Sequence, residues 1–289
     1  MGYLFAFLSV ICFGVSNCLW VFPQKHLPFL TVICLRSGLT SVLFGLFVYL
    51  RCNWTVNRFA HAPAFAYEQA IVISLLSAFG LLLYVFSLRF TAVNIAVPVS
   101  SISAFFGILT AVFFLHEMFT TKIAAVFLII TFGVVLLDNK DSQKKFIFSN
   151  GVWLNLGAAV FWGVTFALFY IPVKKLGALR FSFVLESTVF ALSSVTTLWL
   201  HQWKTIPRSM FFIQLKWIMP LAILGVGGVL FYNLSLQFIP VVFVSLIGCL
   251  VPGISVLVSA VWLGEKITFR KLTGIVILTA GIAALFYCS

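Results

Sequence analysis

The chain has 289 residues, of which 63% are hydrophobic and only 8% are charged, and its mean hydropathy is +1.18. Soluble chains carry about 25% charged residues, so this composition excludes a water-soluble globular protein and a disordered one. The apolar residues occur in runs of about 20, the length that crosses a bilayer as a helix. The sequence therefore predicts a polytopic membrane protein.

The formal net charge is +12, from 18 Lys and Arg against 6 Asp and Glu. The basic residues are scattered through short loops, which favours contact with lipid headgroups over nucleic-acid binding. With so few acidic residues and only 4 His, a catalytic or metal site would have very few candidates. The 6 Cys show no CxxC or metal-ligand spacing and are expected to be small buried hydrophobes. We therefore expect no enzyme, no metal, no cofactor and no nucleic-acid partner.

Apolar runs between polar or proline-containing breaks predict ten transmembrane helices. In chain order they cover residues 2–22, 29–50, 70–89, 93–115, 122–138, 150–171, 181–200, 217–236, 241–262 and 272–287. The apolar residues do not alternate with polar ones, which favours helices over the strands of a membrane barrel. The polar breaks are too short for a soluble domain, so the function is expected to lie within the membrane.

The two halves of the chain align with each other. A shift of 149 residues places Pro23 on Pro172, and a shift of 148 places Tyr84 on Tyr232. Each half holds five predicted spans, and because five is odd the second half must enter the membrane from the opposite side. This pattern predicts an inverted repeat, which is how many secondary transporters are built.

The repeats, placed at residues 1–140 and 149–289, resemble the EamA-type repeat of the drug/metabolite transporter (DMT) superfamily. The residues that carry the resemblance are Ser87-Leu88-Arg89-Phe90-Thr91-Ala92, Leu115-His116-Glu117, Gly133-Val134, Ser235-Leu236, Pro252, Leu263-Gly264-Glu265-Lys266, Gly274, Gly281 and Arg36. The resemblance implies a ten-helix transporter with a cavity lined by spans 1, 3, 4, 6, 8 and 9. It leaves the substrate open among amino acids, other metabolites, drugs, and the anions of the sugar-phosphate and nucleotide-sugar branches.

Two departures from the family pattern concern the fourth span. The first half carries Ala104 where the second half carries Pro252, and has Pro98 at an earlier position instead. It also has His116 where glycine is usual. Pro98 and Pro252 are the predicted hinges, because proline interrupts helical hydrogen bonding, but whether the two halves bend at the same place stays open.

Two charged residues fall inside predicted spans, where a charge is costly. Arg36 lies roughly 10 Å deep at 1.5 Å per residue, and either snorkels to headgroups or lines the cavity and holds a substrate carboxylate. Glu186 aligns with Ser37, next to the repeat position of Arg36. We expect Glu186 to be the partner of Arg36 or a proton-coupling carboxylate, with a position near the membrane interface as the alternative.

Glu117 and Glu265 occupy equivalent ends of spans 4 and 9. Equivalent placement predicts a structural role, such as capping the following helix near Thr120 and Thr268. The uncharged candidates for the cavity are aromatic and amide residues that suit an amphipathic organic substrate. They are Asn17, Trp20, Tyr84, Trp162, Thr165, Tyr232 and Asn233.

The sequence as a whole predicts a secondary transporter that works by alternating access, with proton coupling as an option. It would export or facilitate passage of small metabolites such as amino acids, or of drug-like amphipathic compounds. A transporter of phosphate-bearing substrates and a non-transporting scaffold are the alternatives. We expect a monomer or homodimer in the plasma (inner) membrane. Orientation stays open, because loop charges favour an outside N-terminus whereas the resemblance implies that both termini are cytoplasmic.

Overall fold

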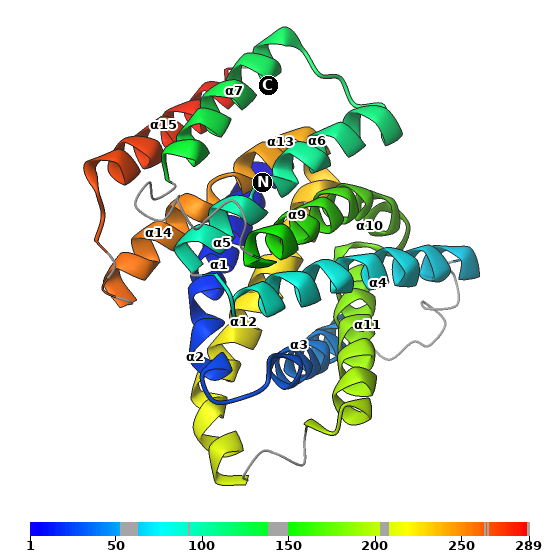
Figure 1. Cartoon of the computed structure of the whole chain (residues 1–289). Helices are drawn as coiled ribbons and strands as arrows, with labels where there is room; N and C mark the ends of the chain where they lie inside the picture. The colour runs from blue at the N-terminus through cyan, green and yellow to red at the C-terminus, as the bar shows by residue number, and fades with distance from the viewer. Residues whose placement is uncertain are drawn as a thin grey trace.

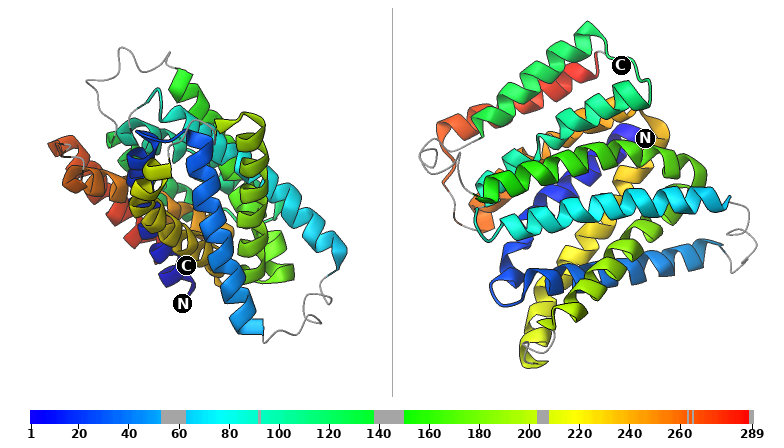
Figure 2. Two further views of the ribbon diagram at one scale, coloured as in Figure 1. Left: turned by 90° about the horizontal axis from the view of Figure 1, so that it is seen from below. Right: turned by 45° about the vertical axis from the view of Figure 1, so that its right-hand side comes forward.

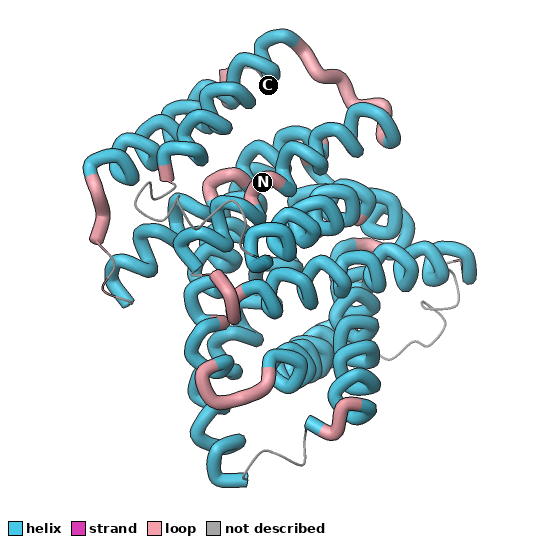
Figure 3. The backbone as a smooth tube through the Cα atoms, viewed as in Figure 1, coloured by secondary structure: helices cyan, strands magenta, loops and turns pink. Residues whose placement is uncertain are grey.

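The computed structural model describes residues 1–52, 63–91, 93–137, 150–202, 208–262, 264 and 266–287 (Figure 1). Within these residues the chain forms helices joined by short loops, and no strand occurs among them (Figure 3). The helices are α1 (Gly2–Leu19), α2 (Val21–Gln24), α3 (Phe29–Cys52), α4 (Ala64–Ser87), α5 (Val93–Ser100), α6 (Ser103–Phe114), α7 (Thr121–Leu136), α9 (Asn150–Leu168), α10 (Tyr170–Leu176), α11 (Ala178–Trp199), α12 (Arg208–Phe238), α13 (Val241–Gly248), α14 (Val251–Trp262) and α15 (Phe269–Leu285).

These helices form an all-α membrane protein of ten successive spans, since four spans are each divided into two helices. Eight of the spans are long and apolar enough to cross a bilayer, and α7 is a shorter apolar helix. The ten-span prediction is therefore confirmed in outline. The two largest differences in boundary are at helix starts: the third span begins at Ala64 rather than at 70, and the eighth begins at Arg208 rather than at 217. Helical hydrogen bonding continues past the apolar stretch in both, so hydropathy alone set the predicted starts too late.

Spans 1 and 6 are interrupted at equivalent positions. Helix α1 ends at Leu19 and α9 ends at Leu168, in each case four residues before a proline, Pro23 or Pro172. A proline has no N–H to donate to the carbonyl four residues earlier, and its ring crowds that carbonyl. The two prolines thus account for both interruptions.

Spans 4 and 9 are also interrupted at equivalent positions, around residues 101–102 and 249–250. In span 9 the last residue of α13, Gly248, again lies four residues before a proline, Pro252. Span 4 has no proline at that spacing. There the hydroxyls of Ser100 and Ser101 both donate to the carbonyl oxygen of Val97, at 2.9 and 2.8 Å. Such back-bonding competes with the helical ladder. The two halves are thus interrupted at the same place, with a proline at the second break and two back-bonded serines at the first.

The packing follows the inverted repeat. Helix α3 packs on α11 and α7 packs on α15, which pairs span 2 with span 7 and span 5 with span 10. Helix α1 of span 1 packs on α12 of span 8, and α9 of span 6 packs on α4 of span 3. The first span of each half thus packs on the third span of the other half. Figure 2 shows the α7 and α15 pair at one edge of the bundle. Their close approach needs glycine, because a Cβ on Gly274 would lie 2.9 Å from the carbonyl oxygen of Gly133.

Candidate functional site

A cavity of about 160 Å³ lies between the halves. It is lined from α1, α3, α4, α5, α6, α9, α12, α13 and α14 and from the breaks within spans 1 and 4, at Trp20 and Ser101. We call it the central cavity. The spans that the resemblance implied, 1, 3, 4, 6, 8 and 9, all contribute to it, and span 2 adds Arg36. Apolar surface predominates, and Arg36 is the charged residue among the described residues that line it.

A second cavity of about 90 Å³ shares Phe13, Arg36 and four other lining residues with the central cavity. It also reaches Glu186 and Asn233, which the central cavity does not. We call it the side cavity. Arg36 therefore faces both spaces, whereas Glu186 faces only the side cavity.

Arg36 and Glu186 form a buried ion pair. The Nη1 atom of Arg36 donates to both carboxylate oxygens of Glu186, at 2.8 and 2.6 Å, and the two residues are 7% and 2% exposed. The inverted repeat brings α3 and α11 together, which is why residues 150 positions apart in sequence can meet. Each charge offsets the cost of burying the other, and removing one partner would leave an uncompensated charge. Neither side chain snorkels out to the headgroups.

An aromatic wall runs along the cavity. The ring centroids of Tyr84 and Trp162 are 5.1 Å apart, those of Trp162 and Phe166 are 6.0 Å apart, and those of Phe166 and Tyr232 are 5.2 Å apart. All four residues line the central cavity. Ring contacts at these distances hold the side chains in place. The wall is thus a preformed apolar surface of successive ring contacts.

Three buried polar atoms near these spaces have no hydrogen-bond partner among the described residues: Arg36 Nε, Tyr84 Oη and Asn233 Oδ1. The amide nitrogen of Asn233 does donate to Ser182 Oγ, at 2.8 Å. A buried polar group without a partner costs about 1–3 kcal/mol, so such groups are commonly those that bind a ligand or water. These three atoms are thus polar groups whose hydrogen-bonding capacity is unused within the described residues.

The structure places the sequence-predicted residues as follows. Asn17, Trp20, Arg36, Tyr84, Trp162 and Tyr232 line the central cavity, and Glu186 and Asn233 line the side cavity together with Arg36, Trp162 and Tyr232. Thr165 lines neither of the two cavities, and its hydroxyl donates to the carbonyl oxygen of Phe161 at 2.8 Å. The hinge candidates flank the span 4 and span 9 breaks, with Pro98 inside α5 and Pro252 second in α14.

Sequence reasoning missed the hydroxyl-bearing part of the central cavity, to which Ser9, Ser16, Ser100, Ser101, Ser103 and Ser245 contribute. A signal for it was present, because Ser100, Ser101 and Ser103 form a polar interruption in an otherwise apolar span. A serine at such a point both bends the helix and offers a hydroxyl to the space that the bend opens.

The expected role of Glu117 needs correction. Its carboxylate accepts the backbone N–H groups of Val241 and Val242, at 2.7 and 2.9 Å, so it caps α13 rather than the following helix α7. The cap of α7 is Thr120, whose hydroxyl accepts from Ile123 N, and Thr268 caps α15 in the same way. The equivalent acidic residue, Glu265, lies outside the described residues.

Within the described part of the chain, no group of three or more His, Cys, Asp or Glu side chains is placed to hold a metal ion. Cys18, Cys34 and Cys249 are buried cysteines outside disulfides, and Cys12 is partly buried. Aromatic, hydroxyl and amide groups and the Arg36–Glu186 ion pair are the functional groups in the lining of the two cavities.

Comparison with known proteins identifies the family of the chain. The model of the EamA-like transporter family matches residues 1–137 and again residues 149–287. The chain is 34% identical over 131 residues to phosphoenolpyruvate/phosphate translocator 1, chloroplastic, of Arabidopsis thaliana, a match that covers 42% of this chain and 32% of that relative. A solved crystal structure, described only as that of a protein, is similar to this chain with a TM-score of 0.75 and 17% identity. The match covers 99% of this chain and 96% of that one. That likeness shows a shared fold.

Proposed function

Because the chain belongs to the EamA-like transporter family, we propose that its central cavity is the binding site of a secondary transporter that works by alternating access. The chain is an integral multi-pass membrane protein, and we place it in the plasma (inner) membrane. The observation that carries the proposal is a cavity between two inverted halves, lined by buried polar atoms without partners. Secondary transporters with inverted repeats bind their substrates at this position between the halves.

The lining favours a small amphipathic organic molecule with one carboxylate, such as an amino acid or a related metabolite. The aromatic wall would take the apolar part of the molecule, and the serine hydroxyls and Tyr84 Oη would take its hydrogen-bonding groups. The guanidinium of Arg36, with its unpartnered Nε, would bind the carboxylate.

A phosphate-bearing substrate is the second candidate, supported by the partial match to a phosphoenolpyruvate/phosphate translocator. The electrostatics of the cavity favour it less. A phosphate ester carries between one and two negative charges near neutral pH, whereas the described lining offers one cation, and that cation is already paired with Glu186. A singly charged or zwitterionic substrate matches this charge better.

Exchange of partners at Arg36 would couple transport to protons. When a substrate carboxylate reaches Arg36 from the central cavity, Glu186 loses its counter-charge within the side cavity. A buried carboxylate without a counter-charge is costly and becomes neutral by binding a proton. Release of the substrate would restore the ion pair and free the proton, so one proton would move with one carboxylate.

The breaks in spans 4 and 9 would serve as the hinges of the access change. Ser101, in the span 4 break, and Gly248 and Val251, on the two sides of the span 9 break, line the central cavity. The proline at position 252 leaves the carbonyl of Gly248 without its helical donor, so bending there sacrifices no helical hydrogen bond. Pro98 and Pro252 lie beside these two breaks. Neither has a backbone N–H, so each leaves the carbonyl four residues earlier without its helical donor.

The test is uptake by proteoliposomes of a labelled panel of amino acids, other monocarboxylates, polyamines, nucleosides and nucleotide sugars. Saturable uptake of a carboxylate class by the wild type, lost in Arg36→Gln, is the expected result. Preferred uptake of phosphate-bearing compounds would favour the second candidate. If no compound in the panel is taken up, the transport proposal gives way to a scaffold role.

A further inference from the structure

We propose that Glu117 is the latch of a gate, which closes one end of the central cavity by joining the two halves and must release when that end opens. The inference rests on the alternating access proposed above. It goes further by assigning the gate to one side chain and two backbone groups. These lie outside the lining of both cavities.

The bond itself is strong and reversible. The two carboxylate oxygens of Glu117 each accept one N–H, from Val241 at 2.7 Å and from Val242 at 2.9 Å. These are the first two residues of α13, where N–H groups have no partner within the helix and where the helix dipole favours a negative charge. On opening, water can take the place of the carboxylate without any loss of helical hydrogen bonds.

The chain before Glu117 is shaped to aim it at α13. Helix α6 ends at Phe114, and His116 follows with a φ of 56°, a conformation that favours glycine. The backbone N–H of Glu117 then donates to the carbonyl oxygen of Ala111, at 3.1 Å, which fixes the turn. The equivalent position in the second half is Gly264, with a φ of 69°.

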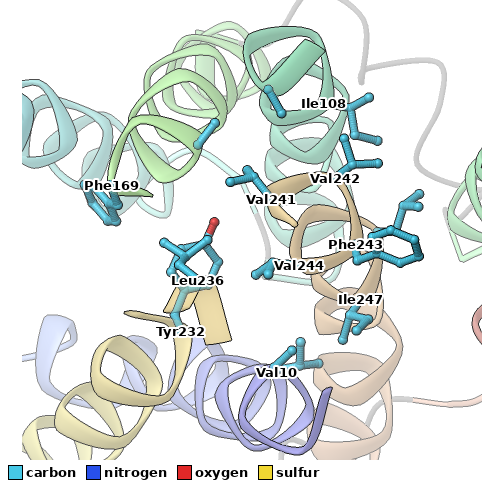
Figure 4. Close-up of a cluster of buried hydrophobic side chains, with 14 of the residues drawn as sticks. Val10, Ile108, Phe169, Tyr232, Leu236, Val241, Val242, Phe243, Val244 and Ile247 are labelled. Carbon is cyan, nitrogen blue, oxygen red and sulfur yellow. The ribbon is translucent and has the colours of Figure 1, made fainter. Parts of the chain in front are cut away.

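The latch lies at an apolar plug, which we define as Ile108, Leu236, Val241 and Val242. All four are at most 4% exposed, and none lines either cavity. In α6, α12 and α13 they lie between the cavity-lining residues Gly107, Tyr232 and Val244 and the same end of the bundle. Figure 4 shows Val241, Val242 and Ile108 gathered where α6 meets α13, with Leu236 and Tyr232 facing them from α12. Separating α6 from α13 here would open a path to the cavity.

A merely structural cap would come from a nearby residue, as Thr120 and Thr268 do for α7 and α15. The residue before α13 is Pro240, which has no side-chain acceptor. The cap comes instead from 124 residues away, in the other half of the chain. A bond between two bodies that rock against each other is made in one state and broken in the other, which is the property of a latch.

The test measures the distance across the gate in the full-length chain with no substrate present. Spin labels on Met118→Cys and Phe238→Cys, in a chain whose native cysteines are replaced by alanine, would lie on the two sides of the gate, because both positions are exposed. Glu117→Gln keeps the size of the side chain but loses its charge and one of its two acceptors. We expect the population at longer distances to rise about tenfold or more, because the loss of one charge-assisted hydrogen bond changes an equilibrium constant by about that factor.

The matched control is Glu68→Gln, which removes the same charge from an exposed site on α4 and should leave the distances unchanged. If Glu117→Gln does not fold, Val241→Pro removes one of the donors at a helix start that tolerates proline, and should lengthen the distances likewise. Unchanged distances in a folded variant would overturn the latch. Because the readout needs no substrate, a wrong substrate class would leave this result standing.

Discussion

The guanidinium of Arg36 occupies space that only a glycine at position 225 leaves free. A Cβ on Gly225 would lie within 2.8 Å of both Nε and the guanidinium carbon of Arg36. The buried ion pair is thus held by three helices: α3 supplies the cation, α11 supplies the anion, and the bare backbone of α12 lies against the guanidinium. Gly225 acts through Arg36 and makes no hydrogen bond to it that the structure records.

Gly225→Ala should push the guanidinium away from its position. We expect a loss of about 1–3 kcal/mol in the free energy of unfolding, the usual cost of overpacking, together with reduced transport. Unfolding in mixed detergent micelles measures the first effect. The matched control is Gly253→Ala, whose Cβ would meet its nearest neighbour at an ordinary 3.6 Å. Equal effects of the two variants would show that the space beside Arg36 has no special importance.

The ion pair should be strongly non-additive under mutation. Arg36→Gln or Glu186→Gln alone leaves one buried charge without a partner, which costs about 3–5 kcal/mol. The double variant removes both charges and should recover a large part of that loss. A double-mutant cycle on the free energy of unfolding measures the coupling. Simple addition of the two single losses would mean that the charges do not depend on each other.

Gly248 offers a way to narrow the central cavity without disturbing packing. It lines the cavity, and a Cβ placed on it meets no atom within 4 Å. Uptake of larger substrates should therefore fall from the wild type to Gly248→Ala and further to Gly248→Leu. In Gly248→Ala the free energy of unfolding should stay within about 1 kcal/mol of the wild type, because the added Cβ strains no contact. Uptake unaffected by leucine would place the substrate path elsewhere.

The strained turn before Glu117 should be sensitive to residue type. A left-handed conformation costs about 1–2 kcal/mol for a residue with a Cβ, so His116→Gly should stabilise the protein, less the extra chain entropy that glycine loses on folding. His116→Val, with a branched Cβ, should destabilise it. Thermal unfolding compares the three proteins. A valine that is tolerated as well as glycine would show that the turn relaxes.

The meeting of Arg36 and Glu186 was predictable from the sequence. Charges within apolar spans need partners, and the repeat alignment places these two residues on spans that an inverted repeat brings together. The ten spans were predictable for the same reason, since their apolar lengths are set by the bilayer. The predicted helix ends were less accurate, because hydropathy marks the membrane and not the limits of hydrogen bonding.

Other features depend on contacts that one sequence does not display. Thr165 was expected to face the cavity, but Trp162 and Phe166 of the same helix line it instead. Neighbouring residues of a helix point in different directions, and the apolar sequence of this span does not indicate which of them faces inward. The partner of Glu117 lies 124 residues away, and nothing local to either segment indicates the pairing. The break in span 4 has two back-bonded serines and no proline four residues after the end of α5, so a search for prolines misplaces it.

The most direct test of the account is uptake of the preferred carboxylate with and without a proton gradient, compared between the wild type and Glu186→Gln. If substrate and proton exchange partners at Arg36, the gradient accelerates uptake by the wild type and has no effect on Glu186→Gln, in which position 186 no longer ionises. Equal uptake by both proteins, with and without the gradient, would contradict the coupling and leave Glu186 a structural partner of Arg36.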